Sequence, residues 1–180
     1  AYDMMREAFD LSEELALPVM LRLVTRLAHS RSAVETVEPR AQNPLSPARD
    51  ARKWTLLPSN ARVQYRHLTE KQPELLRRAE VSPHNRLEVR GRRGVICCGI
   101  AENYLHENLP ADHDLSILSI RQYPLPTEKV RELVGAVDEL LILEDGYPLV
   151  ENMVRGLFGL HGVTVKGRMT GELPRVGEQL

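Results

Sequence analysis

The sequence predicts an α/β fold in which a mostly parallel sheet is covered by helices on both faces. Three short apolar runs carry this prediction: VICCGI (95–100), LSILSI (115–120) and ELLILE (139–144). Runs this short and continuous are typical of strands buried on both sides of a parallel sheet. Two segments of helical period separate them, so the order strand–helix–strand–helix–strand predicts a doubly wound, three-layer αβα architecture.

The segments between the strands have the residue spacing of helices. After the second strand, apolar residues recur at i, i+3, i+4 and i+7, which places them in one stripe facing the sheet. This stripe consists of Val130, Leu133, Val134 and Val137. A shorter stripe after the first strand consists of Ile100, Tyr104, Leu105 and Leu109. The prolines of Pro124-Leu125-Pro126 end the second strand and open the next helix, where the missing N–H group is tolerated.

A helix and a strand are expected before this core unit. Residues 2–16 predict an amphipathic helix, and VMLRLVT (19–25) predicts a strand. The apolar side of the helix consists of Met4, Ala8, Leu11 and Leu15. One helix and one strand cannot enclose a core, so we interpret this pair as the last piece of another domain, followed by a polar linker from residue 26 to about residue 52.

The remaining elements surround the core unit, which is expected at residues 93–170. In the linker and wrapping segment (39–92), residues 61–79 predict a helix broken near Gln72-Pro73, with a turn and cap at Pro58-Ser59-Asn60. Residues 87–89 predict a short edge strand. Residues 149–160 predict a further helix, VTVKGRM (163–169) predicts the last strand, and residues 171–180 have the composition of a second linker.

Composition limits the classes of function. A chain of 180 residues with 42% hydrophobic and 27% charged residues can bury a core without disulfides or metals. Only 4% of the residues are aromatic, which argues against a surface that stacks nucleic-acid bases. No apolar run has the length of a membrane span and no signal peptide opens the sequence, so we expect a cytoplasmic protein without nucleic-acid or membrane partners.

Charge is distributed unevenly although the formal net charge is only −1. Residues 40–93 contain thirteen basic and five acidic residues. Such a segment could meet an anionic ligand or an acidic partner surface. Alternatively, its arginines are solvated or paired within the chain, and an exposed pair of this kind contributes little to stability.

Cysteine and histidine offer no metal site in this sequence. Cys97 and Cys98 are neighbours on a predicted strand, so their side chains point to opposite faces and are expected in the core. The six histidines lack metal-ligand spacing, and the multiple cysteines of zinc or iron–sulfur sites are absent from the sequence. No metal ligand is therefore assigned.

The first candidate site lies where the first core strand turns into a helix. Backbone N–H groups after Gly99 would point into the crevice at the carboxyl ends of parallel strands, where an anionic group could bind. The residues concerned are Gly99, Ile100, Ala101 and Glu102. The alternative is a plain tight turn, because the sequence has one glycine here rather than GxGxxG and the Glu102 carboxylate repels phosphates.

Other candidates follow the remaining strands. The group after the strand at 19–25 consists of Thr25, Arg26, His29 and Ser30, which could line a substrate cleft or form an ordinary seam between domains. Arg26 could pair with a substrate carboxylate. After the third strand, Glu144 and Asp145 are expected to cap the next helix rather than to act in acid–base chemistry. Arg121 and Tyr123 are candidates for the crevice wall.

Several phrases of the sequence together resemble a known enzyme family. They are AFDLSEELALPVMLRLVTRLAHSRS, KWTLLPSNARVQYRHL, SPHNRLE, VICCGIAENYL, YPLP, LILEDGYPLVE and GELPRVGEQL. In this order, and over nearly the whole chain, they resemble the alpha subunit of indolepyruvate ferredoxin oxidoreductase, a thiamine-diphosphate-dependent 2-oxoacid oxidoreductase. The resemblance implies that residues 1–38 end a pyrimidine-binding domain and that residues 93–170 are similar to a transketolase C-terminal domain.

The resemblance also implies an activity, cofactors and partners for the parent enzyme. The reaction is oxidative decarboxylation of indolepyruvate and other aryl pyruvates to arylacetyl-CoA, with reduction of ferredoxin. It requires thiamine diphosphate with Mg, iron–sulfur clusters and coenzyme A as co-substrate. The partners are the remaining domains of the subunit, a beta subunit and ferredoxin. Coenzyme A would then be the ligand of the crevice at residues 99–102.

These implications leave two classes of function open for the 180 residues. The family's catalytic residues are expected outside them, so the chain by itself is expected to be inactive and to hold no cofactor. In the first class, the chain supports assembly of the oxidoreductase and contributes to coenzyme A binding. In the second class, it is a noncatalytic domain-assembly or subunit-interaction module of another thiamine-diphosphate enzyme. An exposed apolar face would indicate missing partners.

Overall fold

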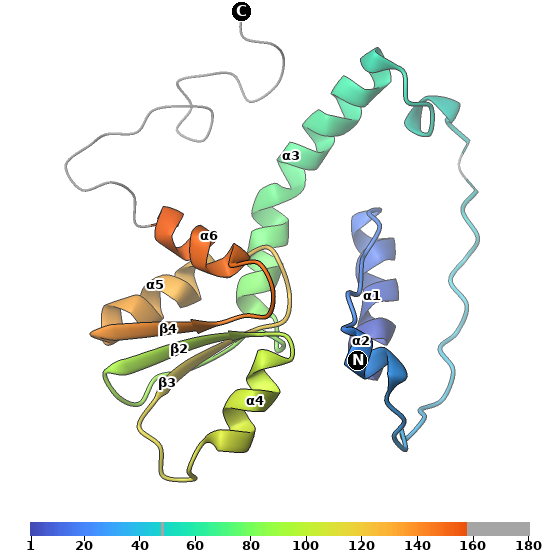
Figure 1. Cartoon of the computed structure of the whole chain (residues 1–180). Helices are drawn as coiled ribbons and strands as arrows, with labels where there is room; N and C mark the ends of the chain where they lie inside the picture. Colours follow the sequence, from blue (N-terminus) through green and yellow to red (C-terminus); the bar gives the residue numbers. More distant parts are fainter. Residues whose placement is uncertain (48, 158–180) are drawn as a thin grey trace, which may run out of the picture. The chain divides into compact units, whose positions relative to one another are not determined.

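A computed structural model of the chain describes residues 1–47 and 49–157 (Figure 1). The chain divides into two compact units, with the division after Pro47. The helix and edge strand expected within residues 39–92 belong to the second unit, because the edge strand is part of its sheet. The domain boundaries expected at residues 38, 92 and 170 stay predictions. The strand expected at residues 163–169 and the linker at 171–180 lie outside the described residues.

The first unit contains helix α1 (Tyr2–Leu15) and the short helix α2 (Thr25–His29). The expected amphipathic helix is thus confirmed, and Leu15, at the end of its predicted apolar side, is buried. The strand expected at 19–25 was wrong. A strand needs partners for its backbone N–H and C=O groups, and residues 1–47 form no second strand with which it could pair.

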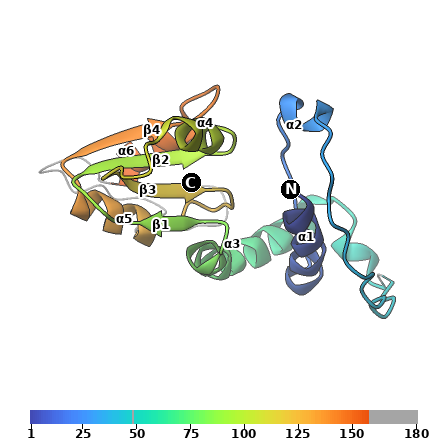
Figure 2. The same ribbon diagram turned by 90° about the horizontal axis from the view of Figure 1, so that it is seen from below.

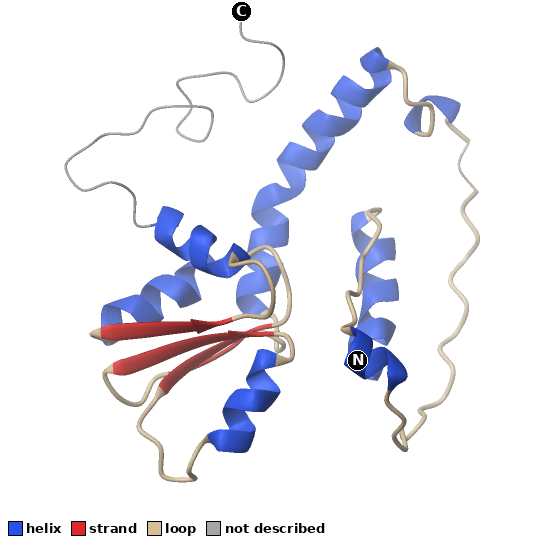
Figure 3. Ribbon diagram, viewed as in Figure 1, coloured by secondary structure: helices blue, strands red, loops and turns tan. Residues whose placement is uncertain are grey.

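The second unit contains the sheet, drawn in red in Figure 3. Its strands are β1 (Arg86–Glu88), β2 (Arg93–Cys98), β3 (Ser116–Ile120) and β4 (Glu139–Leu143). Its helices are the 3-10 helix η1 (Ala51–Lys53), α3 (Pro58–Val81), α4 (Ala101–Asn108), α5 (Thr127–Ala136) and α6 (Leu149–Leu157). Each core strand and helix expected from the apolar runs is present, with boundaries shifted by a few residues.

The sheet has the strand order β1-β3-β2-β4, which is visible when the molecule is seen from below (Figure 2). Strand β2 is parallel to β3 on one side and to β4 on the other, and Ile96 is in register with Leu118 and with Ile142. Strand β1 is the short edge strand that the sequence predicted, and the structure shows that it is antiparallel to β3. The mostly parallel sheet with helices on both faces confirms the predicted α/β class (Figure 1).

Two apolar layers form the core, one on each face of the sheet. On one face, Ile96 and Leu118 pack with residues of α5 and α6, among them Val130 and Val154. On the other face, Val95, Cys97 and Ile117 pack with apolar residues in and after α4. The layers consist of alternating residues along β2, because successive side chains of a strand point to opposite faces. Cys98 packs with the first layer, which confirms that the two cysteines face opposite ways.

Helix α3 is longer than the sequence indicated. It runs without a break from Pro58 to Val81 and contains Pro73, so the break predicted near Gln72-Pro73 was wrong. A proline removes one helical hydrogen bond and often kinks a helix, but flanking turns can retain their own bonds. The predicted turn and cap at residues 58–60 was also wrong, because Pro58 occupies the first helical turn, where its missing N–H group has no partner to lose.

Candidate functional site

The candidate site lies at the carboxyl ends of β2 and β3, which are neighbours in the sheet. Strand β2 leads into α4 on one face, whereas β3 leads into α5 on the opposite face (Figure 1). The loops after β2 and β3 thus leave the carboxyl edge of the sheet on opposite faces, and open α/β sheets bind their ligands at this edge. We call the segments 99–102 and 120–123, which follow the two strands, the switch-point site.

A salt bridge joins the two sides of the switch-point site. The Nε group of Arg121, after β3, donates to Oε2 of Glu102, in the first turn of α4, at 2.5 Å. The side chain of Glu102 is only 6% exposed, whereas that of Arg121 is 41% exposed. His106, one turn further along α4, lies 3.6 Å from the other oxygen of Glu102. Because a buried carboxylate requires a cationic partner, this pair holds α4 and the end of β3 together.

A buried asparagine holds the backbone that carries Arg121. Asn85 is 1% exposed, and its Oδ1 accepts hydrogen bonds from the backbone N–H groups of Arg121 and Gln122, at 2.9 and 3.0 Å. Its Nδ2 group donates to the carbonyl oxygens of Ala79 and Gln122, at 2.9 and 2.8 Å. All four bonds available to the amide are made. Asn85 therefore connects the end of α3 to the loop between β3 and α5.

The helix start at Gly99 is the one predicted from the sequence. Gly99 has a φ of +57°, and a Cβ atom built on it would meet nothing within 4 Å. The N–H group of Glu102 donates to the carbonyl oxygen of Gly99 at 3.4 Å, so this amide is already engaged. No side chain caps α4, whereas Glu80 accepts from the first N–H groups of α5 and Glu144 from those of α6.

The structure places the other predicted site residues as follows. The two oxygens of Glu144 accept from the backbone N–H groups of Val150 and Glu151, which confirms the helix-capping role. Arg121 lies in the switch-point site, and Tyr123, two residues further on, is 50% exposed. In the first unit, the segment from Thr25 to Ser30 is exposed and mostly helical, so it does not follow a strand as expected. Its role in a substrate cleft stays a prediction.

Sequence reasoning missed two features of the switch-point site. It treated Glu102 as a charge that would repel an anion, but the structure neutralises this carboxylate with Arg121. It also assigned no role to Asn85, although the phrase SPHNRLE contains it. A polar residue between a helix and a strand is a weak signal, because only burial distinguishes a structural amide from an ordinary turn residue.

The two cysteines are not activated thiols. Burial, and to a smaller extent the Glu144 carboxylate, raises the pKa of the Cys98 thiol to about 12. Burial also raises the pKa of the Cys97 thiol, whose sulfur lies 3.5 Å from the hydroxyl of Ser119. A thiol with a raised pKa is a poor nucleophile and metal ligand at neutral pH. The cysteines therefore act as core residues.

Many arginines of the basic segment 40–93 are paired within the chain. Glu74 accepts hydrogen bonds from both Arg77 and Arg78, and these bonds lower the pKa of its carboxyl group to about 2. Further pairs join Arg90 with Glu88, Arg92 with Asp138, Arg93 with Asp114 and, in the first unit, Arg40 with Asp10. This favours the second interpretation of the basic segment, in which its charges are satisfied internally.

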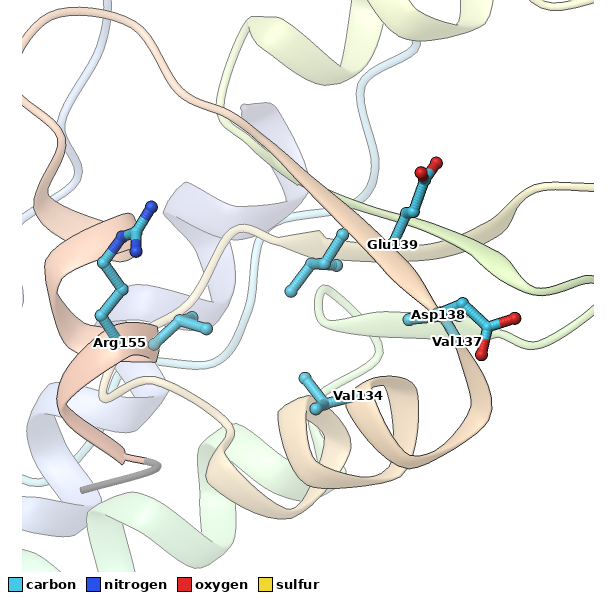
Figure 4. Close-up of a pocket in the computed structure, with 7 residues that line it drawn as sticks. Val134, Val137, Asp138, Glu139 and Arg155 are labelled. Atoms are coloured by element: carbon cyan, nitrogen blue, oxygen red, sulfur yellow. The ribbon is translucent and has the colours of Figure 1, made fainter. Parts of the chain in front are cut away.

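A separate hollow of about 380 Å³ lies between α5, β4 and α6 (Figure 4). Its lining residues are Val134, Val137, Asp138, Glu139, Leu140, Val154 and Arg155. Residues 137–140 form the connection from α5 and the first two positions of β4, so the hollow lies near the amino end of that strand, away from the carboxyl edge where α/β sheets place their ligands. It is therefore not the candidate site.

Two features are absent from residues 1–47 and 49–157. Within these ranges, no three side chains of histidine, cysteine, aspartate or glutamate come together as a metal site would require. Nor does any helix there have the length and apolar character needed to cross a bilayer.

Comparison with known proteins relates the chain to one group of enzyme subunits. No family model and no solved structure match it. The indolepyruvate oxidoreductase subunit IorA of Methanothermobacter thermautotrophicus is 34% identical over 98% of the chain and 30% of that protein. The subunits of the same name from Methanothermobacter marburgensis and Archaeoglobus fulgidus are 33% and 31% identical, each over 97% of the chain. The chain is homologous to part of these subunits.

The homology confirms the resemblance seen in the sequence. It extends over almost the entire chain, whereas the chain spans only 28–30% of the length of the three relatives. The switch-point site therefore lies in a chain that matches one segment of these relatives.

Proposed function

We propose that the chain is part of the alpha subunit of a thiamine-diphosphate-dependent indolepyruvate ferredoxin oxidoreductase. The observation that carries this proposal is the similarity of nearly the whole chain to subunits named for indolepyruvate oxidoreductase. The parent enzyme would oxidatively decarboxylate indolepyruvate and related aryl pyruvates to arylacetyl-CoA and reduce ferredoxin. Two free cysteines fit a reducing, cytoplasmic compartment.

Within this enzyme, the second unit acts as a structural domain and not as the reactive centre. The parent's thiamine diphosphate, Mg and iron–sulfur clusters would be held by protein segments other than these 180 residues. The mostly parallel sheet supports the transketolase C-terminal-like assignment. The beta subunit, the remaining domains and ferredoxin are the proposed partners.

We further propose that coenzyme A binds at the switch-point site. Three features fit a phosphorylated ligand: the open space at Gly99, the α4 start without a side-chain cap, and the neutralised carboxylate of Glu102. Chemistry at the thioester would occur elsewhere, so this chain would bind and orient the carrier. Arg121 would contribute positive charge at the edge of the site.

Two measurements test these proposals. The intact protein, purified with its partner subunit, should reduce ferredoxin when indolepyruvate and coenzyme A are both present, whereas the 180-residue chain alone should show no turnover. Hydrogen exchange followed by mass spectrometry on the intact protein should show slower exchange in residues 99–104 when coenzyme A is added. Turnover by the chain alone would overturn the first proposal, and unchanged exchange would overturn the second.

The alternative is a noncatalytic assembly module, and one observation favours it. In the first unit several apolar side chains are exposed, including Phe9 at 68% and Met20 at 89%. Apolar surface of this kind indicates contacts with other protein segments. Replacing Phe9 with serine should weaken subunit assembly in size-exclusion chromatography under this alternative, and should leave assembly unchanged if the exposed face has no partner.

A further inference from the structure

The geometry points to Arg121 as an oxyanion-binding residue whose orientation is set by Glu102. We propose that the salt bridge holds one edge of the guanidinium, and that the terminal Nη groups bind two oxygens of an anionic ligand. The ligand class is a phosphate or a carboxylate, since both present paired oxygens to the planar fork of an arginine. The inference deepens the proposed function, on which it rests for the choice of ligands.

The first step of the argument is the geometry of the salt bridge. Glu102 contacts the Nε atom of Arg121, at 2.5 Å. Among the hydrogen bonds of the described residues, none uses the Nη1 or Nη2 atom of Arg121. An arginine held only through Nε retains the donors of its two terminal amino groups, which are spaced for bidentate contact with an oxyanion.

The second step is the difference in exposure between the two partners. The Glu102 side chain is 6% exposed and the Arg121 side chain 41% exposed, so the cation faces solvent while the anion does not. Stability alone is a weak reason for such a pair, because removing a carboxylate from water is costly and apolar residues of similar volume often stabilise a protein as well. A buried carboxylate that orients an exposed arginine instead prepares a cationic group for a ligand.

The third step is the rigidity of the backbone that carries Arg121. The N–H group of Arg121 donates to Oδ1 of the buried Asn85, and the next N–H group donates to the same atom. Both the backbone and the guanidinium of Arg121 are therefore held, so little side-chain entropy remains to be lost when an anion binds. The position of Arg121 at the carboxyl edge of the parallel strands agrees with this role.

The test uses isothermal titration calorimetry of the intact protein with pyrophosphate, coenzyme A and indolepyruvate as probes. Removing Arg121 alone would leave a buried charge on Glu102, so the informative variant is the double substitution Glu102→Gln with Arg121→Gln, which retains a hydrogen-bonding pair. Arg121→Lys keeps the charge but loses the fork. Arg93→Gln is the matched control, because Arg93 is an exposed, paired arginine at the amino end of β2.

The double variant should bind the recognised anion about 10- to 100-fold more weakly, the loss expected for hydrogen bonds to a charged group. Arg121→Lys should show an intermediate loss, and Arg93→Gln should bind like the unmodified protein. Loss of pyrophosphate and coenzyme A binding identifies a phosphate ligand, and loss of indolepyruvate binding alone identifies a carboxylate. If no probe depends on Arg121, the inference is overturned.

The outcomes also separate this inference from the proposed coenzyme A site. Arg121-dependent binding of pyrophosphate without binding of coenzyme A would support the oxyanion role and overturn the assignment of coenzyme A. Binding of coenzyme A that is equal in the unmodified protein and the double variant would overturn the role of Arg121 and retain coenzyme A as ligand. Circular dichroism of each variant establishes that it is folded before titration.

Discussion

Replacing Asn85 with alanine should be among the most destabilising single changes in the second unit. The substitution removes four hydrogen bonds, two accepted by Oδ1 and two donated by Nδ2. Ala79 is fully buried, so its carbonyl group cannot find water as a substitute, whereas the backbone at 121 and 122 is partly reachable. Each buried polar group left without a partner costs about 1–3 kcal/mol.

The Ala79 carbonyl group should lose the full amount, and the three backbone groups at residues 121 and 122 should each lose less. The expected loss in the free energy of unfolding is therefore about 3–5 kcal/mol, a large part of the stability of a typical domain. Urea unfolding followed by far-UV circular dichroism measures the free energy of unfolding. Hydrogen exchange should also become faster at residues 121 and 122, because their N–H groups lose the acceptor on Asn85.

The matched control is Asn108→Ala. Asn108 makes one exposed side-chain hydrogen bond, from Nδ2 to the carbonyl oxygen of Tyr104 at 2.8 Å. Removing this hydrogen bond should change the free energy of unfolding by less than about 0.5 kcal/mol. The reasoning would be refuted if the two variants differed by less than about 1 kcal/mol, since Asn85 would then not hold the loop.

Four further predictions follow from individual residues. Gly91→Ala should destabilise the second unit by about 1–3 kcal/mol, because a Cβ atom would overlap the backbone oxygen of Asp114. Gly135→Ala should stabilise the second unit by about 0.5–1 kcal/mol, because Gly135 lies in α5 and a Cβ atom there would meet nothing. Urea unfolding midpoints equal to that of the unmodified protein would contradict both glycine predictions. Two arginines of its own helix lower the pKa of Glu74 from 4.5 to about 2, so its stabilisation is complete above pH 4.5 and is lost towards pH 2. The difference in free energy of unfolding between the unmodified protein and Glu74→Gln should therefore shrink as the pH falls from 4.5 to about 2. A difference that stays constant over this range would contradict the prediction. Because burial raises the pKa of Cys98 to about 12, iodoacetamide at pH 8 should label it far more slowly in folded than in urea-unfolded protein, as mass spectrometry would reveal.

Most of the helices and strands of the second unit could be predicted from the sequence. The runs at 95–100, 115–120 and 139–144 were sufficient because strands of a parallel sheet between helices are mostly apolar, and this pattern is local. The strand expected at residues 19–25 shows that a local pattern alone does not make a strand. Its apolar pattern was suitable, but a strand also needs a neighbour, and residues 1–47 supply none.

The candidate site was predictable only in part. The helix start at Gly99 was recognised because a glycine directly after a buried strand is a local signal, and the positive φ agrees with it. Arg121 was only a candidate for the crevice wall, and its link to Glu102 was not foreseen. These residues are 19 positions apart, so their contact depends on the placement of two strands and one helix.

By itself, the sequence determined the α/β class, the places of the core strands and the relationship to indolepyruvate oxidoreductase subunits, because these depend on residue order and local apolar spacing. Only the tertiary structure decided that β2 and β3 lie side by side with their helices on opposite faces, that Glu102 is neutralised and that Asn85 holds the loop after β3. The physical reason is that burial and salt-bridge partners are set by contacts between distant segments.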